Sequence, residues 1–279
     1  MTDQLKILFA GCGDIAQRAA ARTSHQSFGL RRNPQNLPDG IVPIAADITD
    51  STGLVSILDR AFDVVVVSLT PGAFTEQAYR DSYVKAAEAL SRAIAETEKK
   101  PSLVIWVSST SVYGNNNGAW VNEDSVTAPQ SFSGKLLLEA EQLIAGLPCD
   151  HCIVRFSGIY GPGRTRMLSQ IKAGKGRPAQ PEQWSNRIHS DDCGGVLSHI
   201  IDRFAAGLTV DNLYLATDSA PVTQHNLRRW LAEQLGVALT DELVEQKAVR
   251  RCSNQRLLAS GYRFIYPSYK EGYLALMAD

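Results

Sequence analysis

Two polar side chains in the middle of the chain have the types and spacing of residues that act together in a ligand-binding crevice. Ser109 follows the apolar run 103–107, and Lys135 stands near the start of the next helical stretch. An apolar run of this kind is typical of a buried strand. In an open α/β sheet, groups at the carboxyl end of a strand and on the following helix point into one crevice, where ligands bind. We therefore expect Ser109 and Lys135 to face one crevice, where they are candidates for chemistry on a bound ligand.

A glycine-rich turn follows the first apolar run, residues 5–10, and precedes a helical stretch rich in alanine and arginine. Its spacing, GxGxxA, is that of dinucleotide-binding turns, whose glycines let the backbone approach a pyrophosphate beside a helix N-terminus. We predict a dinucleotide site here; the alternative is an ordinary tight turn. The candidate residues are Gly11, Gly13, Asp14, Ile15 and Ala16.

Two arginines indicate which dinucleotide to expect. Arg31 and Arg32 follow a short strand, at a place where an NAD-preferring site usually carries an acidic residue for the ribose hydroxyls. No acidic residue lies between His25 and Pro38. Arginine binds the oxygens of a 2′-phosphate in pairs. The sequence therefore predicts NADP(H) rather than NAD(H) as the cofactor, and the alternative is two solvated loop arginines.

Strands and helices alternate through the first 156 residues. This alternation predicts a Rossmann-type doubly wound parallel α/β sheet with right-handed crossovers. The third and fourth strands and a long helix over 75–99 belong to it, and the two strand ends add cofactor candidates: Asp47, Ile48, Ser68, Leu69 and Thr70. We expect a dinucleotide-binding domain over 1–156, to which 188–216 returns. A smaller substrate-binding lobe would comprise 157–187 and 217–279.

The composition excludes several classes of protein. With 279 residues, 44% of them hydrophobic, the chain can bury the core of one large α/β domain and a smaller lobe. A net charge of -1 gives no reason to expect nucleic acid or a membrane surface as a partner. The five cysteines are scattered without paired CxxC units, so we expect no metal site. No apolar segment approaches the ~18 residues of a membrane span, and no signal peptide is visible. We expect a cytoplasmic protein.

These features together resemble the extended short-chain dehydrogenases/reductases, the NAD(P)-dependent epimerase/dehydratase family, and more closely an atypical branch of it. The resemblance covers nearly the whole length. It rests on the order of residues 11–16, 47–50, 108–114, Lys135, Arg155 with 160–163, 188–192 and 214–227. It implies hydride transfer between a nicotinamide cofactor and the carbonyl or secondary alcohol of a small-molecule substrate, with a nucleotide sugar as one candidate.

The family's catalytic unit is incomplete in this chain. In the family, a YxxxK unit supplies a tyrosine that exchanges a proton and a lysine that binds the nicotinamide ribose and lowers the tyrosine pKa. Here the unit reads Ser131-Phe-Ser-Gly-Lys135, and the resemblance gives Ser109 the role of holding the substrate oxygen. An aliphatic hydroxyl is far less acidic than a phenol, whose pKa is about 10. Ser131 is therefore a candidate catalytic residue with a second interpretation as a hydrogen-bonding spacer.

Further residues are candidates for binding the substrate. They are Tyr113, Ser157, Tyr160, Arg164 and His189. For the tyrosines and the histidine the alternative is a structural role. For Arg164 and its neighbour Arg166, which the resemblance places near a substrate diphosphate, the alternative is surface charge. Asp81 stands on the helix where the resemblance places a supporting asparagine, and the alternative is a solvated helix acid.

Two functions follow as hypotheses. The first is an NADP(H)-preferring oxidoreductase of the epimerase/dehydratase type with a degenerate YxxxK site. The second is a non-catalytic NADP(H)-binding sensor or interaction protein, which the missing tyrosine favours. A homodimer is also expected as one possibility, because the family often packs the helices after strands four and five into a bundle. The apolar face of residues 136–144 permits this, although core packing explains it equally well.

Overall fold

The computed structural model describes residues 4–242 and 250–278. The chain forms two compact units. The first unit contains residues 1–112, 129–155 and 193–214, and the second contains residues 113–128, 156–192 and 215–279. Each unit is therefore built from several separate stretches of the chain.

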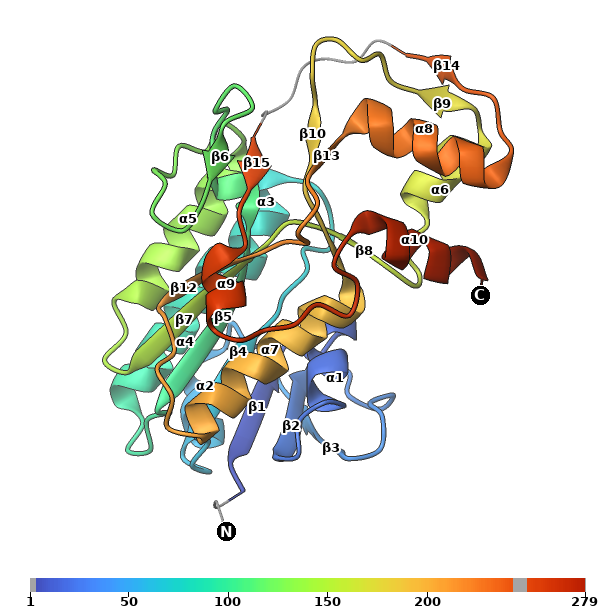
Figure 1. The fold of residues 1–279 in the computed structure, drawn as a ribbon. Helices are drawn as coiled ribbons and strands as arrows, with labels where there is room; N and C mark the ends of the chain where they lie inside the picture. The colour runs from blue at the N-terminus through green and yellow to red at the C-terminus, as the bar shows by residue number, and fades with distance from the viewer. Residues whose placement is uncertain (1–3, 243–249, 279) are drawn as a thin grey trace. The chain divides into compact units, whose positions relative to one another are not determined.

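A seven-stranded sheet with the order β12-β7-β5-β4-β1-β2-β3 organises the first unit (Figure 1). The strands are β1 (Lys6–Ala10), β2 (Gln26–Arg31), β3 (Ile41–Ala45), β4 (Val64–Val67), β5 (Leu103–Ser109), β7 (Asp150–Phe156) and β12 (Leu213–Ala216). The pairings of β1 with β2 and β4, of β2 with β3, and of β4 with β5 are all parallel. The strand order reverses between β1 and β4, so the predicted doubly wound Rossmann-type fold is confirmed.

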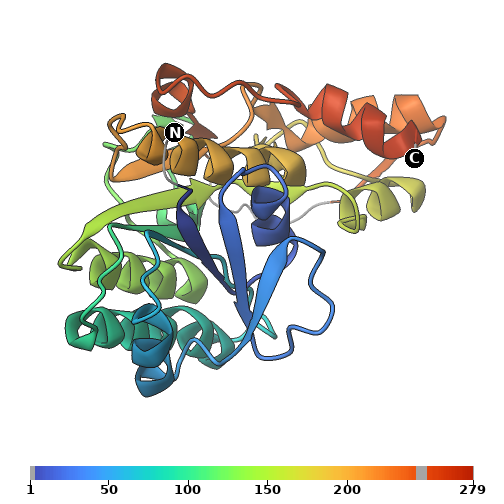
Figure 2. The same cartoon turned by 90° about the horizontal axis from the view of Figure 1, so that it is seen from below.

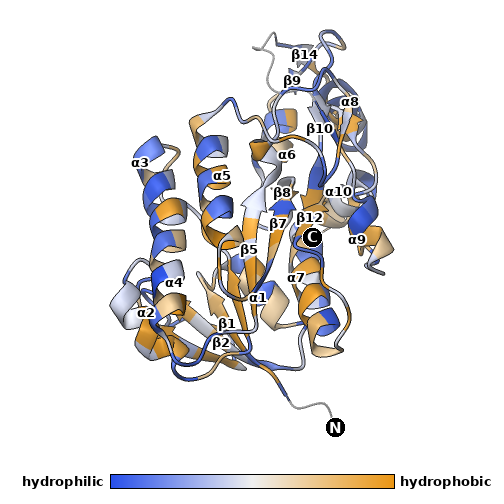
Figure 3. Ribbon diagram, turned by 90° about the vertical axis from the view of Figure 1, so that its left-hand side faces the viewer, coloured by the Kyte–Doolittle hydropathy of each residue, from blue (hydrophilic) through white to orange (hydrophobic). Residues whose placement is uncertain are grey.

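Helices cover both faces of this sheet (Figures 1 and 2). One face carries α2 (Ser51–Leu58), α4 (Lys85–Glu96) and α5 (Phe132–Ala145), and the other carries α1 (Asp14–Ala20) and α7 (Ser190–Ala205). Because both faces are covered, the central strands are apolar along their length (Figure 3), and all four valines of β4 are buried. Gly194 of α7 has no room for a Cβ, which would lie 2.6 Å from Cβ of Arg18 on α1.

The helical stretch after β4 is not the single helix predicted over 75–99. It consists of α3 (Glu76–Tyr79), a π-helical turn (Arg80–Val84) and α4. Thr75 caps its start, accepting a hydrogen bond at its hydroxyl from the N–H of Ala78 at 3.2 Å. In the π-helical turn, the Tyr83 hydroxyl donates to the carbonyl oxygen of Leu69 at 3.2 Å. This turn brings its residues against the end of β4, and sequence periodicity alone did not indicate it.

The second unit is built from short strand pairs and helices. The pairs are β8 (Gly158–Tyr160) with β11 (Arg187–His189), β10 (Trp184–Ser185) with β13 (Val222–Thr223), β9 (Lys175–Gly176) with β14 (Thr240–Asp241), and β6 (Trp120–Val121) with β15 (Arg251–Cys252). The helices are α6 (Arg166–Lys172), α8 (Gln224–Leu235), α9 (Gln255–Ala259) and α10 (Tyr269–Ala278). The glycine- and proline-rich stretch 158–163, whose composition is typical of a loop, begins with the three residues of β8.

A separate apolar core holds this unit together. Leu227 and Leu231 of α8 pack with Tyr160 and Tyr273, whose rings stack at 4.5 Å between centroids. Gly272 lets α10 approach Tyr160, because a Cβ there would overlap the Tyr160 hydroxyl. Among the described helices, none is both long and apolar enough to cross a membrane.

Candidate functional site

The first unit contains a cavity of about 440 Å³ beside the glycine-rich turn, here called the glycine-turn cavity. Gly11 has φ +76°, and a Cβ at this position would lie 2.5 Å from the carbonyl oxygen of Ser68. Only glycine meets both requirements. The N–H groups of Gly11 and Cys12 both reach the carbonyl oxygen of Leu30, at 2.9 and 3.2 Å. The turn after β1 is therefore held close to the ends of β2 and β4, as a pyrophosphate cradle requires.

Charged side chains enter the glycine-turn cavity from β2 and β3. Arg31, Arg32 and Asp47 are all among its lining residues. The backbone N–H of Thr49, its hydroxyl and the charge of Arg32 hold the pKa of Asp47 below its ordinary value. A carboxylate acceptor and two guanidinium donors thus face one cavity, and this set fits a ribose with a phosphate group.

Most predicted cofactor residues line this cavity. They are Gly11, Gly13, Arg31, Arg32, Asp47, Ile48, Ser68, Leu69 and Thr70. Asp14 instead pairs with Arg18 at 2.7 Å, while Ile15 and Ala16 are buried in the core. Asp81 and Ser82 of the π-helical turn also line the cavity. Sequence reasoning missed Ser82, because an uninterrupted helix gives no signal that its residues reach the ends of the strands.

Cys12 was also missed, although it lies inside the predicted turn. It is buried and lines the glycine-turn cavity, and burial raises the pKa of its thiol to about 11. The thiol is therefore neutral at ordinary pH and is suited to packing under the turn.

The three predicted catalytic residues lie on β5 and at the start of α5. Ser109 is the last residue of β5, and its hydroxyl accepts from the N–H of Ser111 at 3.2 Å. Ser131 is the N-cap of α5, where its hydroxyl accepts from the N–H of Gly134 at 3.1 Å and lies 3.0 Å from that of Ser133. Lys135 is exposed in the first turn of α5. Ser131 has extended backbone geometry and precedes the helix, and its carbonyl oxygen accepts from the N–H of Lys135 at 3.1 Å.

A buried polar group fixes β5 and α5 against each other. Glu141 of α5 accepts a 2.5 Å hydrogen bond from Ser108 and pairs with Arg155 of β7 at 2.6 Å. The Arg155 and Glu141 side chains are only 7% and 3% exposed. Ser109 and Lys135 therefore stand on two elements, β5 and α5, that the buried hydrogen bond from Ser108 to Glu141 ties together.

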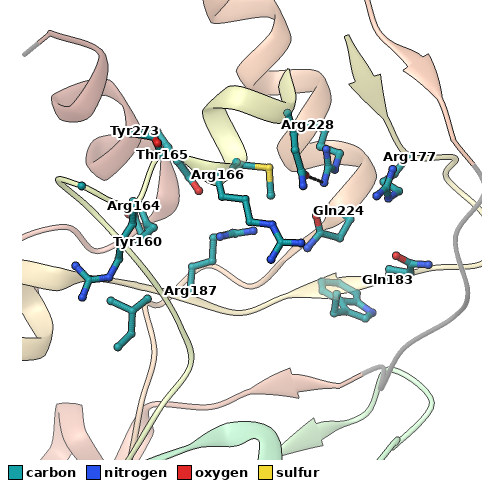
Figure 4. Close-up of a pocket in the computed structure, with 15 residues that line it drawn as sticks. Tyr160, Arg164, Thr165, Arg166, Arg177, Gln183, Arg187, Gln224, Arg228 and Tyr273 are labelled. Atoms are coloured by element: carbon teal, nitrogen blue, oxygen red, sulfur yellow. Dashed lines mark hydrogen bonds between the residues drawn. The ribbon is translucent and has the colours of Figure 1, made fainter. Parts of the chain in front are cut away.

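The second unit contains a larger cavity of about 790 Å³, here called the arginine cavity (Figure 4). Its lining includes Arg164, Arg166, Arg177, Arg187 and Arg228. These side chains come from the loop after β8 and from α6, the segment after β9, β11 and α8. Among the described residues that line it, none is acidic. The cavity is therefore suited to negatively charged ligands.

The predicted substrate residues are placed differently from one another. Tyr160 and Arg164 line the arginine cavity. Tyr113 is buried and donates to the carbonyl oxygen of Asn122 at 2.8 Å, and Ser157 bonds Thr217 at 2.9 Å. His189 is buried and accepts at Nδ1 from the N–H of Asp191 at 3.2 Å. In the described structure, these last three residues line neither cavity.

Sequence reasoning missed most of the arginine cavity. Its other lining residues include Arg177, Gln183, Trp184, Arg187, Gln224, Arg228 and Tyr273. They are spread over about a hundred positions without a motif, so only the tertiary structure brings them together. In addition, no cluster of three or more potential metal-binding His, Cys, Asp or Glu side chains is found within the described residues.

Comparison with known proteins supports one family. The model of the RmlD substrate binding domain matches residues 11–256, which include the lining of the glycine-turn cavity and that of the arginine cavity except Tyr273. The chain belongs to this family. The resemblance to the NAD(P)-dependent epimerases/dehydratases that the sequence indicated is thereby confirmed. A search of curated proteins found none that matches.

Several solved structures are similar to this chain over nearly its whole length. A protein of Methylobacillus flagellatus assigned to the NAD-dependent epimerases/dehydratases is 38% identical, with a TM-score of 0.82, and the match covers 99% of this chain and 98% of that one. A human epimerase family protein with NADPH is 19% identical, with a TM-score of 0.78 and coverage of 96% and 97%. The UDP-glucuronic acid 4-epimerase of Bacillus cereus with NAD is 20% identical, with a TM-score of 0.77 and coverage of 96% of each chain. The last two similarities concern the fold.

Proposed function

We propose that the protein is an NADP(H)-preferring oxidoreductase of the epimerase/dehydratase type, acting on a carbonyl or secondary alcohol of an anionic small molecule. In this proposal the first unit binds the dinucleotide and the second binds the substrate. Nucleotide sugars are among the candidate substrates, as in the UDP-glucuronic acid 4-epimerase. The observation that carries the proposal is the glycine-turn cavity, whose shape requires Gly11 and whose lining includes two arginines.

The charges of the glycine-turn cavity support the preference for NADP(H). Arg31 and Arg32 line it at the end of β2, where an acidic residue would repel a 2′-phosphate. Guanidinium groups bind phosphate oxygens in pairs. The human relative with NADPH agrees with this choice, and the bacterial relative with NAD shows that the fold accepts both nucleotides.

In the proposed reaction each of a few residues has one role. The bound cofactor would give or take a hydride. Ser109, at the end of β5, would hold the substrate oxygen by a hydrogen bond, and Lys135 would bind the nicotinamide ribose. Ser131 contributes by starting α5, because its hydroxyl caps the helix and is a poor acid. The proton would therefore be exchanged with water or with another side chain.

A second candidate function is a non-catalytic NADP(H)-binding sensor or interaction protein. The engagement of Ser131 as a helix cap favours it, because the position of the family's tyrosine then carries no acid or base. Retention of Ser109 and Lys135 favours the enzyme. The two functions share the cofactor and differ only in turnover. A location in the cytoplasm and assembly as a homodimer stay predictions in both cases.

Thermal unfolding with NADP, NADPH, NAD and NADH tests the proposal. A ligand at about 100 times its dissociation constant adds about 2.7 kcal/mol to stability, which shifts Tm by several degrees. We expect the shift with the NADP pair and a smaller one with the NAD pair. No shift with any nucleotide would rule out both candidate functions.

Turnover separates the two candidates. NADPH oxidation would be screened with carbonyl compounds, and NADP reduction with secondary alcohols, including nucleotide sugars. Lys135→Met should abolish any activity found, whereas Lys99→Met, which changes an exposed lysine after α4, should leave it unchanged. If the wild-type protein shows no turnover and Ser131→Tyr creates it, the non-catalytic function of the wild type is supported.

A further inference from the structure

The arginine cavity has an excess of positive charge, because nearby acidic side chains do not neutralise all of its arginines. Arg177 lies 3.5 Å from Glu242, a half-exposed ion pair. Burial and the charges of Arg177 and Arg187 lower the pKa of Arg228 to about 10, so Arg228 is still charged at neutral pH. The guanidinium groups therefore repel one another across the cavity, and a ligand with several negative charges would relieve this repulsion.

Several residues that line this cavity have a buried polar atom without a partner in the described structure. These atoms are Nε of Arg187, Nε of Arg228, Nε1 of Trp184, Oε1 of Gln224 and the hydroxyl of Tyr273. Arg228 and Tyr273 are only 4% and 1% exposed. A buried polar group without a partner costs about 1–3 kcal/mol. Five residues of this one cavity thus carry polar groups whose hydrogen bonds the described protein does not complete.

The protein fixes the guanidinium group of Arg228 through hydrogen bonds from both of its terminal nitrogens. One terminal nitrogen donates to the carbonyl oxygen of Lys175 at 2.8 Å, and the other donates to Oε1 of Gln170 at 2.7 Å. Nε has no partner in the described structure, and each terminal nitrogen keeps a second N–H beyond these two bonds. Preorganised donors bind anions with little loss of conformational entropy, so this residue is suited to recognising an oxyanion at a fixed position.

The aromatic rings of the cavity are already used by the protein. The Arg251 guanidinium lies over Trp184 at 4.9 Å, and Tyr160 stacks on Tyr273 at 4.5 Å. Nucleobases gain about 1–3 kcal/mol by stacking on an aromatic face. With one face of each ring covered, and the polar atoms of Trp184 and Tyr273 lacking partners, the cavity favours recognition of charge over stacking of a base.

We propose that the arginine cavity binds a compact polyanion that carries two or more phosphate or carboxylate groups beside hydroxyls, rather than a nucleotide held by its base. Five arginines supply the charge, and Gln224 supplies an amide for a ligand hydroxyl. Sugar bisphosphates and hydroxylated polycarboxylates have this chemistry. The assignment of this polyanion as the substrate rests on the proposed function. Its binding to the cavity does not.

Isothermal titration calorimetry without nicotinamide nucleotide tests the proposal. The probes are inorganic pyrophosphate, fructose 1,6-bisphosphate, citrate and UDP at equal ionic strength. We expect the bisphosphate or citrate to bind at least as tightly as UDP, and the preferred one identifies the anionic group. UDP binding more than about tenfold tighter than pyrophosphate, or no binding by any probe, would overturn the proposal.

Variants locate the binding in the cavity. Arg166→Met and Arg187→Met should each weaken the polyanion about tenfold, because hydrogen bonds to charged groups contribute about 1.5–3 kcal/mol. Arg229→Met is the matched control: it neighbours Arg228 on α8 but pairs with Asp241 outside the cavity lining. Arg166 is exposed, so its variant should fold normally. Unchanged binding in both cavity variants would overturn the proposal.

The experiments distinguish a failure of the proposed function from a failure of the polyanion assignment. Arg31→Gln/Arg32→Gln changes the glycine-turn cavity alone and should leave polyanion binding unchanged. If the polyanion binds but no nicotinamide nucleotide does, the proposed function fails while the assignment of the arginine cavity stands. If nucleotides bind and all the polyanions fail, only the inference about the arginine cavity is lost.

Discussion

Glu141 and Arg155 form a buried ion pair with an N–O distance of 2.6 Å between α5 and β7. Nε of the same guanidinium donates to both carboxylate oxygens, at 3.0 and 3.2 Å. Ser108 adds a third element, β5, through its 2.5 Å hydrogen bond to Glu141. The carboxylate is thus saturated with donors, and its removal would leave Arg155 buried without its main partner.

Glu141→Ala should lower the free energy of unfolding by about 3–5 kcal/mol, because breaking a buried pair leaves an uncompensated charge. The double variant Glu141→Leu/Arg155→Met should recover most of this loss. Urea unfolding at neutral pH measures both. Glu139→Ala, on the same helix, removes a half-exposed pair with Arg80 and should cost at most about 1 kcal/mol. If Glu141→Ala and Glu139→Ala lowered the free energy of unfolding equally, the buried pair would contribute no more to stability than the half-exposed pair.

Gly134→Ala should destabilise the protein although it places a good helix former in α5. The added Cβ would fall on the carbonyl oxygen of Ser111, in the turn after β5, and overpacking of this kind costs about 1–3 kcal/mol. Gly146→Ala at the end of the same helix meets only ordinary contacts, with Leu143 O at 3.5 Å, and should be nearly neutral. Thermal unfolding compares the two, and a neutral Gly134→Ala would contradict the tight packing of α5 on that turn.

Ser131→Ala removes the N-cap of α5 and should cost about 1 kcal/mol. Because the hydroxyl is engaged with Gly134 and Ser133, we expect the affinity for NADPH to change less than twofold. Ser131→Thr keeps a capping oxygen and should retain most of the stability. A large loss of NADPH affinity in Ser131→Ala, with stability unchanged, would instead indicate a direct role at the cofactor.

Arg31→Gln/Arg32→Gln should weaken NADP(H) by about 10- to 100-fold, since each hydrogen bond from a charged donor contributes about 1.5–3 kcal/mol. NAD(H) has no 2′-phosphate, and its affinity should change little. Fluorescence titration of NADPH and NADH measures both. Parallel losses for the two nucleotides would show that these arginines do not read the 2′-phosphate. Arg60→Gln, in the same unit but outside the glycine-turn cavity, is the control.

The titration of Asp218 should be visible in the pH dependence of the free energy of unfolding. Burial raises the pKa of this carboxyl from 3.8 to about 8, against the charge of Arg187. The folded state therefore favours the neutral acid: its contribution to stability is complete below pH 3.8 and is lost as the pH rises through about 8. Asp218→Asn keeps the acceptor for the Ala220 N–H and removes the titration.

Relative to the wild type, Asp218→Asn should gain stability between pH 5 and pH 8, by about 1.4 kcal/mol or more, the equivalent of one pKa unit. Unfolding in urea at pH 5, 6.5 and 8 measures this difference. Asp202→Asn, an exposed acid on α7, should follow the wild type at all three pH values. A constant difference between Asp218→Asn and the wild type would show that Asp218 does not titrate in this range.

The sequence was sufficient for the sheet and for most of the glycine-turn cavity, because these depend on local patterns. The apolar runs of β1, β4 and β5 and the spacing of Gly11 and Gly13 are contiguous in the chain. Parallel strands place their carboxyl ends at one edge of the sheet, so the sequence predicts that residues following different strands lie close together.

Residues brought together by tertiary packing alone were not predicted. Arg187 and Arg228 belong to β11 and α8, and neither stands in a recognisable motif. Ser131 matched a family position, yet its role as a cap depends on where α5 begins, and a helix boundary is hard to read from sequence. His189 belongs to a motif, but its burial reflects packing against Tyr160 and Tyr266.

The π-helical turn at Arg80–Val84 has a consequence for comparing this chain with its relatives. A π-turn accommodates one residue more than the α-helix around it. A relative with an uninterrupted helix here should therefore align with a one-residue gap inside 80–84, not in the loops on either side. Without that gap, Asp81 and Ser82 would be matched to the wrong positions, and a comparison of the residues around the cofactor would mislead.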